Sequence, residues 1–545
     1  MNRKLRIISG AVAAMLAVAA LTSCGKNPQG KSDNDLANAE IMTENVMPIS
    51  EEGITLSVWA QNRSQGYMNS YNDMLAFQEI EKKTGVKLDF SHPVGTELEQ
   101  LNIILASGDY PDIIVYYWGN EPLIQRTYKS GVAIELDEYV EKYAPNLKAA
   151  LASDELYQRQ MKLLSEERML YFPHLIDDVK HCAYDGFFIR QDWLDAVGKQ
   201  MPATIEEWED VLTAFRDTDL NQNGQADEIP FSTHADARMT NEVFAGAFGL
   251  PAYGYFYNSR TGKISHSVLE PEFKDYLTTM NRWYSEGLVN KNYMSTTGKE
   301  LDSMVLNNEL GAFYGTNNND IVKYMQMDSS LDFVAAPYPT AKDGKKYHTN
   351  KASISTVRNR GAIITTACKY PVEAVRYFDY LYTKEASDLI NWGIKDESYT
   401  VGSDGEYQFT ELISNNPEGK TPAEAICKYM TITGGFGFTQ YKAAAALNSD
   451  LSDKAKKVID DSVNYSLETD KSLLLPYMPG TADEKTEIAT LSADLSTYMS
   501  EMYNKFILGY EPLENYDDFV QQCKDLGIEK IIAIYQTAYD RAMAQ

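Results

Sequence analysis

Apolar and polar positions follow a regular order over the first part of the folded chain. Residues 54–59 (ITLSVW) alternate between apolar and polar side chains, which is typical of a half-buried strand. Two amphipathic stretches with helical spacing follow, and the first stops at Gly85. The predicted elements are strands at 54–59, 86–90 and 113–116 and helices at 71–83 and 97–106. Strands and helices in this alternation predict an α/β lobe with a largely parallel sheet.

A separate apolar run occupies the amino terminus. The charged segment 1–6 (MNRKLR) precedes residues 7–21, which are mostly Ala, Val, Ile, Leu and Met. This order is that of a secretory signal peptide, and the run is shorter than the roughly 20 apolar residues of a bilayer span. The polar stretch 24–53 that follows is expected to be a flexible tether.

The end of that run, Leu21-Thr22-Ser23-Cys24, is similar to a bacterial lipobox, whose cysteine becomes lipid-modified and then amino-terminal. We therefore expect a lipoprotein signal peptide over 1–23 and a mature chain anchored through Cys24 to the extracellular face of the cell membrane. An uncleaved anchor and an ordinary secretory leader are the alternatives.

Composition narrows the function classes. The chain has 78 acidic and 50 basic residues and a formal net charge of −28, which argues against binding to nucleic acid. Four cysteines remain besides Cys24, and their spacing fits neither a zinc site nor a redox centre. Buried thiols are expected, with one or two disulfides as the alternative. These cysteines are Cys182, Cys368, Cys427 and Cys523.

Three groups of segments match a known protein family in order along the chain. They are 81–86 (EKKTGV), 99–102 (EQLN) and 105–114 (LASGDYPDII); then 187–195 (FFIRQDWLD) and 202–208 (PATIEEW); then 361–365 (GAIIT) and 371–381 (PVEAVRYFDYL). Together with the lipobox, they resemble family 1 extracellular solute-binding proteins, the lipid-anchored receptors of ATP-driven importers. The region beyond about residue 405 matches less distinctly.

The resemblance implies a bilobed α/β fold of the periplasmic-binding-protein type II kind, with a multi-strand hinge between the lobes. It divides the chain into lobe one, 54–175 and 350–400, and lobe two with the C-terminal helices, 185–345 and 405–545. The hinge would pass near 180–187 and 337–360. The family further implies a monomer that closes over a solute, delivers it to the transmembrane subunits of an ABC permease and performs no chemistry.

The sharpest chemical motif is 219–228 (DLNQNGQADE). Oxygen-bearing side chains fall at positions 1, 3 and 5, glycine at 6 and a carboxylate at 9, as in the first half of an EF-hand calcium loop. Pro230 replaces the final glutamate of that motif, and Asp227 is a further candidate through water. We expect a structural Ca²⁺, and an ion-free Asn/Gly-rich turn is the alternative. The expected ligands are Asp219, Asn221, Asn223, Gln225 through its carbonyl, and Glu228.

Aromatic and polar side chains at strand ends and in loops are the candidate ligand residues. Open α/β sheets bind ligands at the carboxyl ends of their strands, and sugars are held by a stacked ring and edge hydrogen bonds. The chain has 37 Tyr and 6 Trp, and the family that it resembles leans toward carbohydrate ligands. An oligosaccharide is therefore the first expected ligand and a peptide the second. Packing in the core or at its rim is the alternative for each aromatic. The candidates are Trp59, Arg63, Tyr117, Trp118, Tyr184, Asp185, Tyr255, Tyr257 and Trp392.

Motifs for catalysis are mostly absent from the sequence. The six histidines show no metal-binding spacing, and there is no G-x-S-x-G, H-E-x-x-H or phosphate-binding glycine loop. A pair of carboxylates at glycosidase separation can arise by chance among 78 acids. Two competing hypotheses therefore stand beside the receptor: an extracellular polysaccharide-acting hydrolase lipoprotein, and a surface adhesion module that binds polymer without lobe closure.

Overall fold

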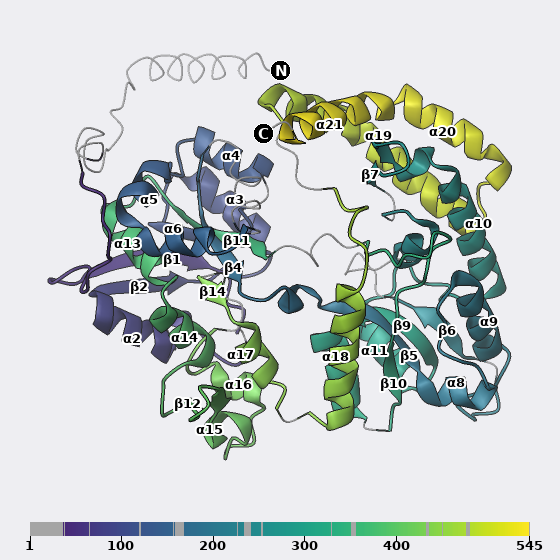
Figure 1. Ribbon diagram of the computed structural model, residues 1–545, viewed down its shortest axis with the longest axis horizontal. Helices are drawn as coiled ribbons and strands as arrows, with labels where there is room; N and C mark the ends of the chain where they lie inside the picture. Colours follow the sequence, from purple (N-terminus) through teal and green to yellow (C-terminus); the bar gives the residue numbers. More distant parts are fainter. Residues whose placement is uncertain are drawn as a thin grey trace, which may run out of the picture.

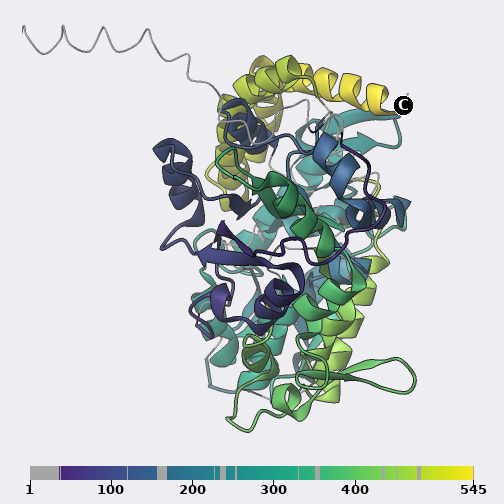
Figure 2. The ribbon, with the colours of Figure 1, turned by 90° about the vertical axis from the view of Figure 1, so that its left-hand side faces the viewer.

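The computed structural model shows two lobes beside each other, each built on its own β-sheet (Figure 1). Figure 2 views the same molecule from the side of the first lobe. The structure describes Leu36 and residues 39–543, without 65, 119–120, 156, 158–167, 226, 234–240, 252–253, 329, 350–355, 432–434, 436, 450 and 476–479. The proposed lipid site, Cys24, lies outside the described residues.

A six-stranded sheet forms the first lobe, in the order β14-β4-β11-β3-β1-β2. β1 pairs in parallel with β2 and β3, as the strand and helix pattern predicts. β11 runs antiparallel between β3 and β4, and β14 is parallel to β4. The strands are β1 (Ile54–Ala60), β2 (Val86–Ser91), β3 (Ile113–Tyr116), β4 (Phe172–Ile176), β11 (Val357–Ile364) and β14 (Phe438–Thr439).

Packed cores lie on both faces of this sheet. Ile113 and Val115 of β3 belong to one hydrophobic core, whereas Ile114 and Tyr116 belong to another. Because successive strand residues point to opposite faces, the continuous apolar run of β3 is buried on both sides. The other elements of this lobe are η1 (Tyr71–Asp73), α2 (Leu75–Thr84), α3 (Glu97–Ser107), α4 (Glu121–Lys129), α5 (Asp137–Tyr143), α6 (Pro145–Ala152), α13 (Pro371–Tyr380), α14 (Lys384–Trp392), β12 (Tyr399–Val401), β13 (Tyr407–Phe409), α15 (Glu411–Ser414), α16 (Pro422–Ile426) and α17 (Tyr441–Ala446).

The second lobe contains a four-stranded sheet in the order β10-β5-β9-β6. β5 is antiparallel to β10 and β9, and β9 is parallel to β6. Phe187 and Phe188, neighbours on β5, enter different cores, so this sheet is also buried on both faces. The strands of the lobe are β5 (Asp185–Arg190), β6 (Ile229–Ser232), β9 (Leu310–Thr316) and β10 (Phe333–Ala336), with a separate hairpin of β7 (Tyr255–Asn258) and β8 (Lys263–His266).

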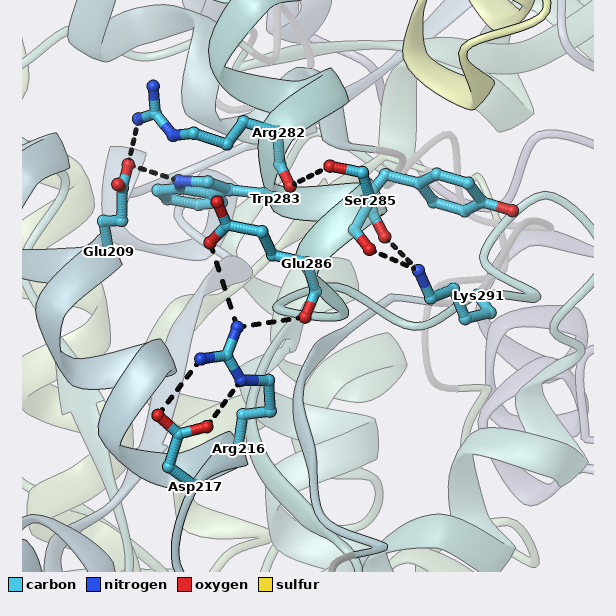
Figure 3. Close-up of polar contacts among 9 residues, drawn as sticks. Glu209, Arg216, Asp217, Arg282, Trp283, Ser285, Glu286 and Lys291 are labelled. Atoms are coloured by element: carbon cyan, nitrogen blue, oxygen red, sulfur yellow. Dashed lines mark hydrogen bonds and ion pairs between the residues drawn. The ribbon is translucent and has the colours of Figure 1, made fainter.

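Helices of the second lobe are joined by polar contacts as well as by the core. Glu209 of α9 accepts hydrogen bonds from Arg282 and from the indole of Trp283 on α10, and Arg216 pairs with Glu286 (Figure 3). The helical elements are η2 (Val179–Cys182), α8 (Gln191–Val197), α9 (Ile205–Arg216), η4 (Asn241–Phe248), η5 (Ser267–Leu269), α10 (Pro271–Glu286), α11 (Gly298–Leu306), η6 (Asn317–Ile321), α12 (Val322–Met327), α18 (Asp453–Leu467), α19 (Ala482–Leu508), η8 (Leu513–Asn515), α20 (Tyr516–Asp525) and α21 (Ile528–Met543).

The described residues place three passages of the chain between the lobes. The first passage joins β4 to β5 and the second joins β10 to β11. The third lies between Leu447, in a core of the first lobe, and Leu451, in a core of the second. Three connections of this kind form the hinge that the resemblance implies.

The expected boundary between lobe one and lobe two near residue 405 differs from the one in the structure. The sequence-based division placed 405–545 in lobe two, but the part up to Leu447 packs with lobe one. β14 pairs with β4, and Ile413 and Ile426 pack against Ala76 of α2. Short helices such as α15 and α16 show too few turns of periodicity to indicate which sheet they cover.

The expected tether, 24–53, is attached to the first lobe from Met42 onward. The Met42 amide donates to the Lys142 carbonyl at 2.8 Å. The Asn45 amide donates to the Arg376 carbonyl at 2.8 Å and to the Asp379 carboxylate at 3.0 Å, and it accepts from Arg376 Nε at 3.1 Å. The partners of Asn45 lie more than 300 positions away in the sequence, so local polarity alone suggested a loose segment.

The four cysteines of the folded body are buried free thiols, as expected. Burial raises the pKa of the Cys368 thiol to about 12, so this group is protonated at neutral pH. None of these cysteines has the exposed, electropositive surroundings of a reactive thiol.

Replacing Asn45 tests the attachment of the amino-terminal segment. Asn45→Ala removes two hydrogen bonds with Arg376 and one with the fully buried Asp379, and we expect it to lower the free energy of unfolding by about 1–3 kcal/mol. Urea unfolding followed by circular dichroism measures the change. The exposed neighbour Glu44 provides the control, Glu44→Ala, which should have no effect. Equal unfolding midpoints for both variants would contradict the attachment.

Candidate functional site

Two loops leave the first sheet at the same edge and bring Arg63 and Tyr117 together. β1 ends at Ala60 and β3 ends at Tyr116, and these strands pair in parallel. The Arg63 guanidinium donates an Nη1–H to the Tyr117 hydroxyl at 3.2 Å. This carboxyl edge is the place where open α/β sheets bind their ligands.

A second arginine holds the ring of Tyr117 from its face. The guanidinium of Arg360, on β11, lies 5.0 Å from the ring centroid, and the Tyr116 ring meets Tyr117 edge-on at 5.5 Å. A cation–π contact contributes about 0.5–2 kcal/mol. Tyr117 nevertheless remains 39% exposed. A fixed and partly exposed aromatic ring is suited to stacking on the apolar face of a sugar.

Arg360 also forms a buried ion pair with Glu97, the first residue of α3. Arg360 Nη2 lies 3.1 Å from Glu97 Oε1, and the side chains are 4% and 11% exposed. Gly435 packs against the stem of Arg360, where a Cβ would come within 2.9 Å of Cγ. Among the described residues, nothing accepts a hydrogen bond from Arg360 Nε or Nη1. We call Arg63, Glu97, Tyr117 and Arg360 the edge cluster.

Two of the predicted ligand residues on these strands are core residues. Trp59 and Trp118 are both buried and pack together with Ile114 on one face of the sheet. The Trp118 indole donates to the Ile114 carbonyl at 3.0 Å. Their rings contribute to folding of the lobe, and neither presents a face to a ligand in this structure.

Three other predicted aromatics lie in packing contacts away from the edge cluster. Tyr255 lies 4.8 Å from Tyr535 of α21, centroid to centroid, and Tyr257 stacks on Tyr539 at 5.1 Å. Trp392 is buried beside the β12–β13 hairpin, and its indole donates to the Gln440 side chain at 2.8 Å. The structure therefore gives each of these rings a structural neighbour.

Tyr184 and Asp185 lie where the first passage between the lobes enters β5. The Tyr184 carbonyl accepts from the Asn317 amide at 2.8 Å, and the Asp185 carbonyl accepts from the Tyr338 hydroxyl at 3.2 Å. The Asp185 carboxylate is fully buried, 3.7 Å from His348 Nε2, and burial lowers the pKa of His348 to about 3. These contacts fix the hinge end of the second lobe.

Sequence reasoning selected Arg63 and Tyr117 as ligand candidates but did not select Glu97 and Arg360, which the structure places beside Tyr117 and each other. Glu97 was assigned only to the start of a helix, and Arg360 only to the hinge. A charged residue immediately before the apolar strand run 361–364 is the one local signal for Arg360. Its position beside Tyr117 follows from the antiparallel pairing of β11 with β3, which no local pattern reveals.

The loop predicted to bind calcium turns tightly around the Asp219 carboxylate. Asp219 accepts from the amides of Asn223 at 3.1 Å and Gly224 at 3.0 Å. Gln222 and Gly224 have φ angles of 59° and 82°, in the left-handed region that Gly224 adopts without strain. The Asn223 side-chain oxygen accepts from the Gln225 amide at 2.7 Å.

Glu228 closes this loop. Its Oε1 accepts from the amides of Leu220 at 2.6 Å and Asn221 at 3.2 Å. Its Oε2 is buried and makes no hydrogen bond within the described part of the chain. A buried carboxylate oxygen without a hydrogen-bond partner needs an explanation, and a bound hard cation such as Ca²⁺ would supply one. No described group of three or more His, Cys, Asp or Glu side chains is arranged for a metal.

Comparison with curated proteins found relatives along nearly the whole chain. The fructooligosaccharide ABC transporter substrate-binding protein FusA of Streptococcus pneumoniae serotype 4 is 25% identical over 98% of this chain and 98% of its own. Lipoprotein LipO of Bacillus subtilis is 24% identical over 83% of this chain and 86% of its own.

Solved structures share the fold. FusA as an EF-hand mutant in complex with fructo-nystose has a TM-score of 0.71 at 22% identity, over 90% of this chain and 100% of that chain. The alginate-binding protein AlgQ2 without calcium ion has a TM-score of 0.68 at 22% identity, over 90% of this chain and 99% of that chain. The fold is therefore the bilobed, periplasmic-binding-protein-like type II fold.

No helix in the described part of the chain has the length and apolar character needed to cross a membrane. The family model for bacterial extracellular solute-binding proteins matches residues 68–388, which is more than half of the sequence. That match spans all strands of the second sheet and three members of the edge cluster, Glu97, Tyr117 and Arg360; Arg63 lies just before it. The chain belongs to the family of bacterial extracellular solute-binding proteins.

Proposed function

We propose that this protein is the lipid-anchored substrate-binding component of an ABC importer and that it binds an oligosaccharide between its two lobes. The observation that carries this proposal is the edge cluster, where Tyr117 is fixed by two arginines and remains partly exposed. The family match supports the receptor role, and the carbohydrate ligand named for FusA supports the ligand class.

Binding would begin on the first lobe. A sugar ring stacks on Tyr117, while Arg63 donates hydrogen bonds to the ring substituents and Glu97 accepts them. The second lobe then closes over the sugar through the three connections, because a ligand shifts a two-state equilibrium toward the state that it contacts more extensively. Release to the permease reverses this closure.

The arrangement favours binding over hydrolysis. Glycoside hydrolysis by the common mechanism needs two carboxyl groups on either side of the scissile bond. The edge cluster contributes one carboxylate, and that group is already in an ion pair with Arg360. A hydrolase would also need a proton donor, whereas Tyr117, Arg63 and Arg360 offer a stacking ring and hydrogen-bond donors.

We further propose lipid attachment at Cys24, with the mature protein on the extracellular face of the membrane. The lipobox motivates this proposal, and the likeness to lipoprotein LipO supports it. Anchoring would act on the first lobe, because the chain from Met42 to Ile49 is bonded to that lobe. The transmembrane partners would be the permease subunits of the importer.

Calcium would serve a structural role in the second lobe. Asp219, Asn221, Asn223 and Glu228 would hold the ion through side-chain oxygens and Gln225 through its carbonyl. The buried Oε2 of Glu228 is the observation in favour, since an ion would supply its missing partner. The EF-hand named for FusA and the calcium ion named for AlgQ2 support the same assignment.

Thermal unfolding with a panel of oligosaccharides tests the receptor function. A bound sugar should raise the unfolding midpoint, since binding to the native state stabilises it by about 2.7 kcal/mol at 100 times Kd. Tyr117→Ala should abolish the shift and lower the midpoint of the free protein only slightly, since the cation–π contact that it removes contributes about 0.5–2 kcal/mol. Tyr539→Ala on α21, whose ring stacks on Tyr257, provides the control and should keep the shift. Cleavage of a glycan without any shift would favour the hydrolase.

Removal of calcium tests the metal site. We expect a chelator to lower the unfolding midpoint and added Ca²⁺ to restore it. Glu228→Gln should weaken calcium binding at least tenfold in calorimetry, since a neutral amide replaces the buried carboxylate. Glu206→Gln changes the same charge on an exposed turn of α9 and should leave calcium binding unchanged. An unfolding midpoint that does not change with chelator would contradict the proposed calcium site.

A further inference from the structure

Arginines gather at the carboxyl edge of the first sheet, although the chain as a whole carries a net charge of −28. Arg358 and Arg360 both lie on β11, and Arg63 follows β1. All three arginines lie close enough to His174 on β4 to act on it. Burial chiefly, and additionally the positive charges of these arginines, lower the pKa of His174 to about 3. A local positive field therefore surrounds the edge cluster.

The carboxylates of Glu97, Asp177 and Asp178 already have partners. Glu97 pairs with Arg360 at 3.1 Å. Asp178 accepts from the Lys180 amide at 2.9 Å at the start of η2, and Asp177 accepts from the Tyr441 amide at 2.8 Å. Each of these acids therefore has a structural contact that would be lost if it turned toward Arg63.

Arg63 differs from the other two arginines. It is exposed, and its side chain donates to the neutral hydroxyl of Tyr117. No carboxylate among the described residues lies within ion-pair distance of its guanidinium. One of its five N–H donors reaches Tyr117, so the remaining donors are available at the rim of the exposed ring.

From this arrangement we infer that the bound saccharide carries a carboxylate, and that Arg63 is the specificity-determining residue that pairs with it. The inference rests on the proposed function. A pyranose stacked on Tyr117 presents its substituents around the ring edge, and Arg63 lies at the hydroxyl end of Tyr117. A uronic acid places its carboxylate at such an edge position, where a planar guanidinium can bind it through two hydrogen bonds.

Calorimetry with matched sugars tests this inference. The probes are trimers of galacturonate, glucuronate or mannuronate and their fully methyl-esterified forms, which keep the rings and remove the charge. We expect one of the acidic trimers to bind at least tenfold more tightly than its ester, with an affinity that falls as salt increases. Arg63→Gln should remove most of this preference, since the charge-assisted hydrogen bond is lost.

The control variant is Arg282→Gln, which makes the same charge change on α10 of the second lobe (Figure 3). It should leave the preference for the acid unchanged. Equal affinities for acid and ester, or a preference that survives Arg63→Gln, would overturn the inference and leave the receptor function intact. Binding of neutral oligosaccharides alone would also overturn the inference while leaving the receptor function intact. If no saccharide of either kind binds, the proposed function fails together with the inference.

Discussion

The antiparallel return of β11 into the first sheet is the constraint on which the rest of the structure depends. β11 comes back from the second lobe and inserts between β3 and β4, so the first lobe is complete only after the chain has built most of the second. The same insertion places Arg360 over Tyr117 and against Glu97. β11 thus joins the two parts of the first sheet and follows one of the hinge connections. Its Arg360 also fixes the Tyr117 ring, which we propose holds the ligand.

The two-lobed arrangement allows each lobe to be rigid while the lobes move relative to each other. Each lobe has cores on both faces of its sheet, and the amino-terminal segment adds hydrogen bonds to the first lobe only. The lobes are joined by three connections, so relative motion can occur without opening a core. Buried contacts at the second lobe's end of the hinge, between Asp185, Tyr338 and His348, keep that end ordered.

Local patterns in the sequence predicted the early strands and helices well, because periodicity and the stop at Gly85 act within a few residues. They misplaced the segment up to Leu447 and the segment from Met42, whose partners lie far away in the sequence. The same limit applies to the site. Arg63 and Tyr117 could be selected as candidates from the sequence because they come just after predicted strands. Selecting Glu97 and Arg360 would have required the order of the strands in the sheet. Buried aromatics such as Trp118 look identical in sequence to exposed ones.

The central claim is that an oligosaccharide closes the two lobes. Small-angle X-ray scattering of the mature protein, with and without an oligosaccharide that raises its unfolding midpoint, tests this claim most directly. The account predicts a smaller radius of gyration in the presence of the sugar and recovery of the intact sugar afterwards. An unchanged radius of gyration at saturating sugar, or recovery of cleaved sugar, would contradict it.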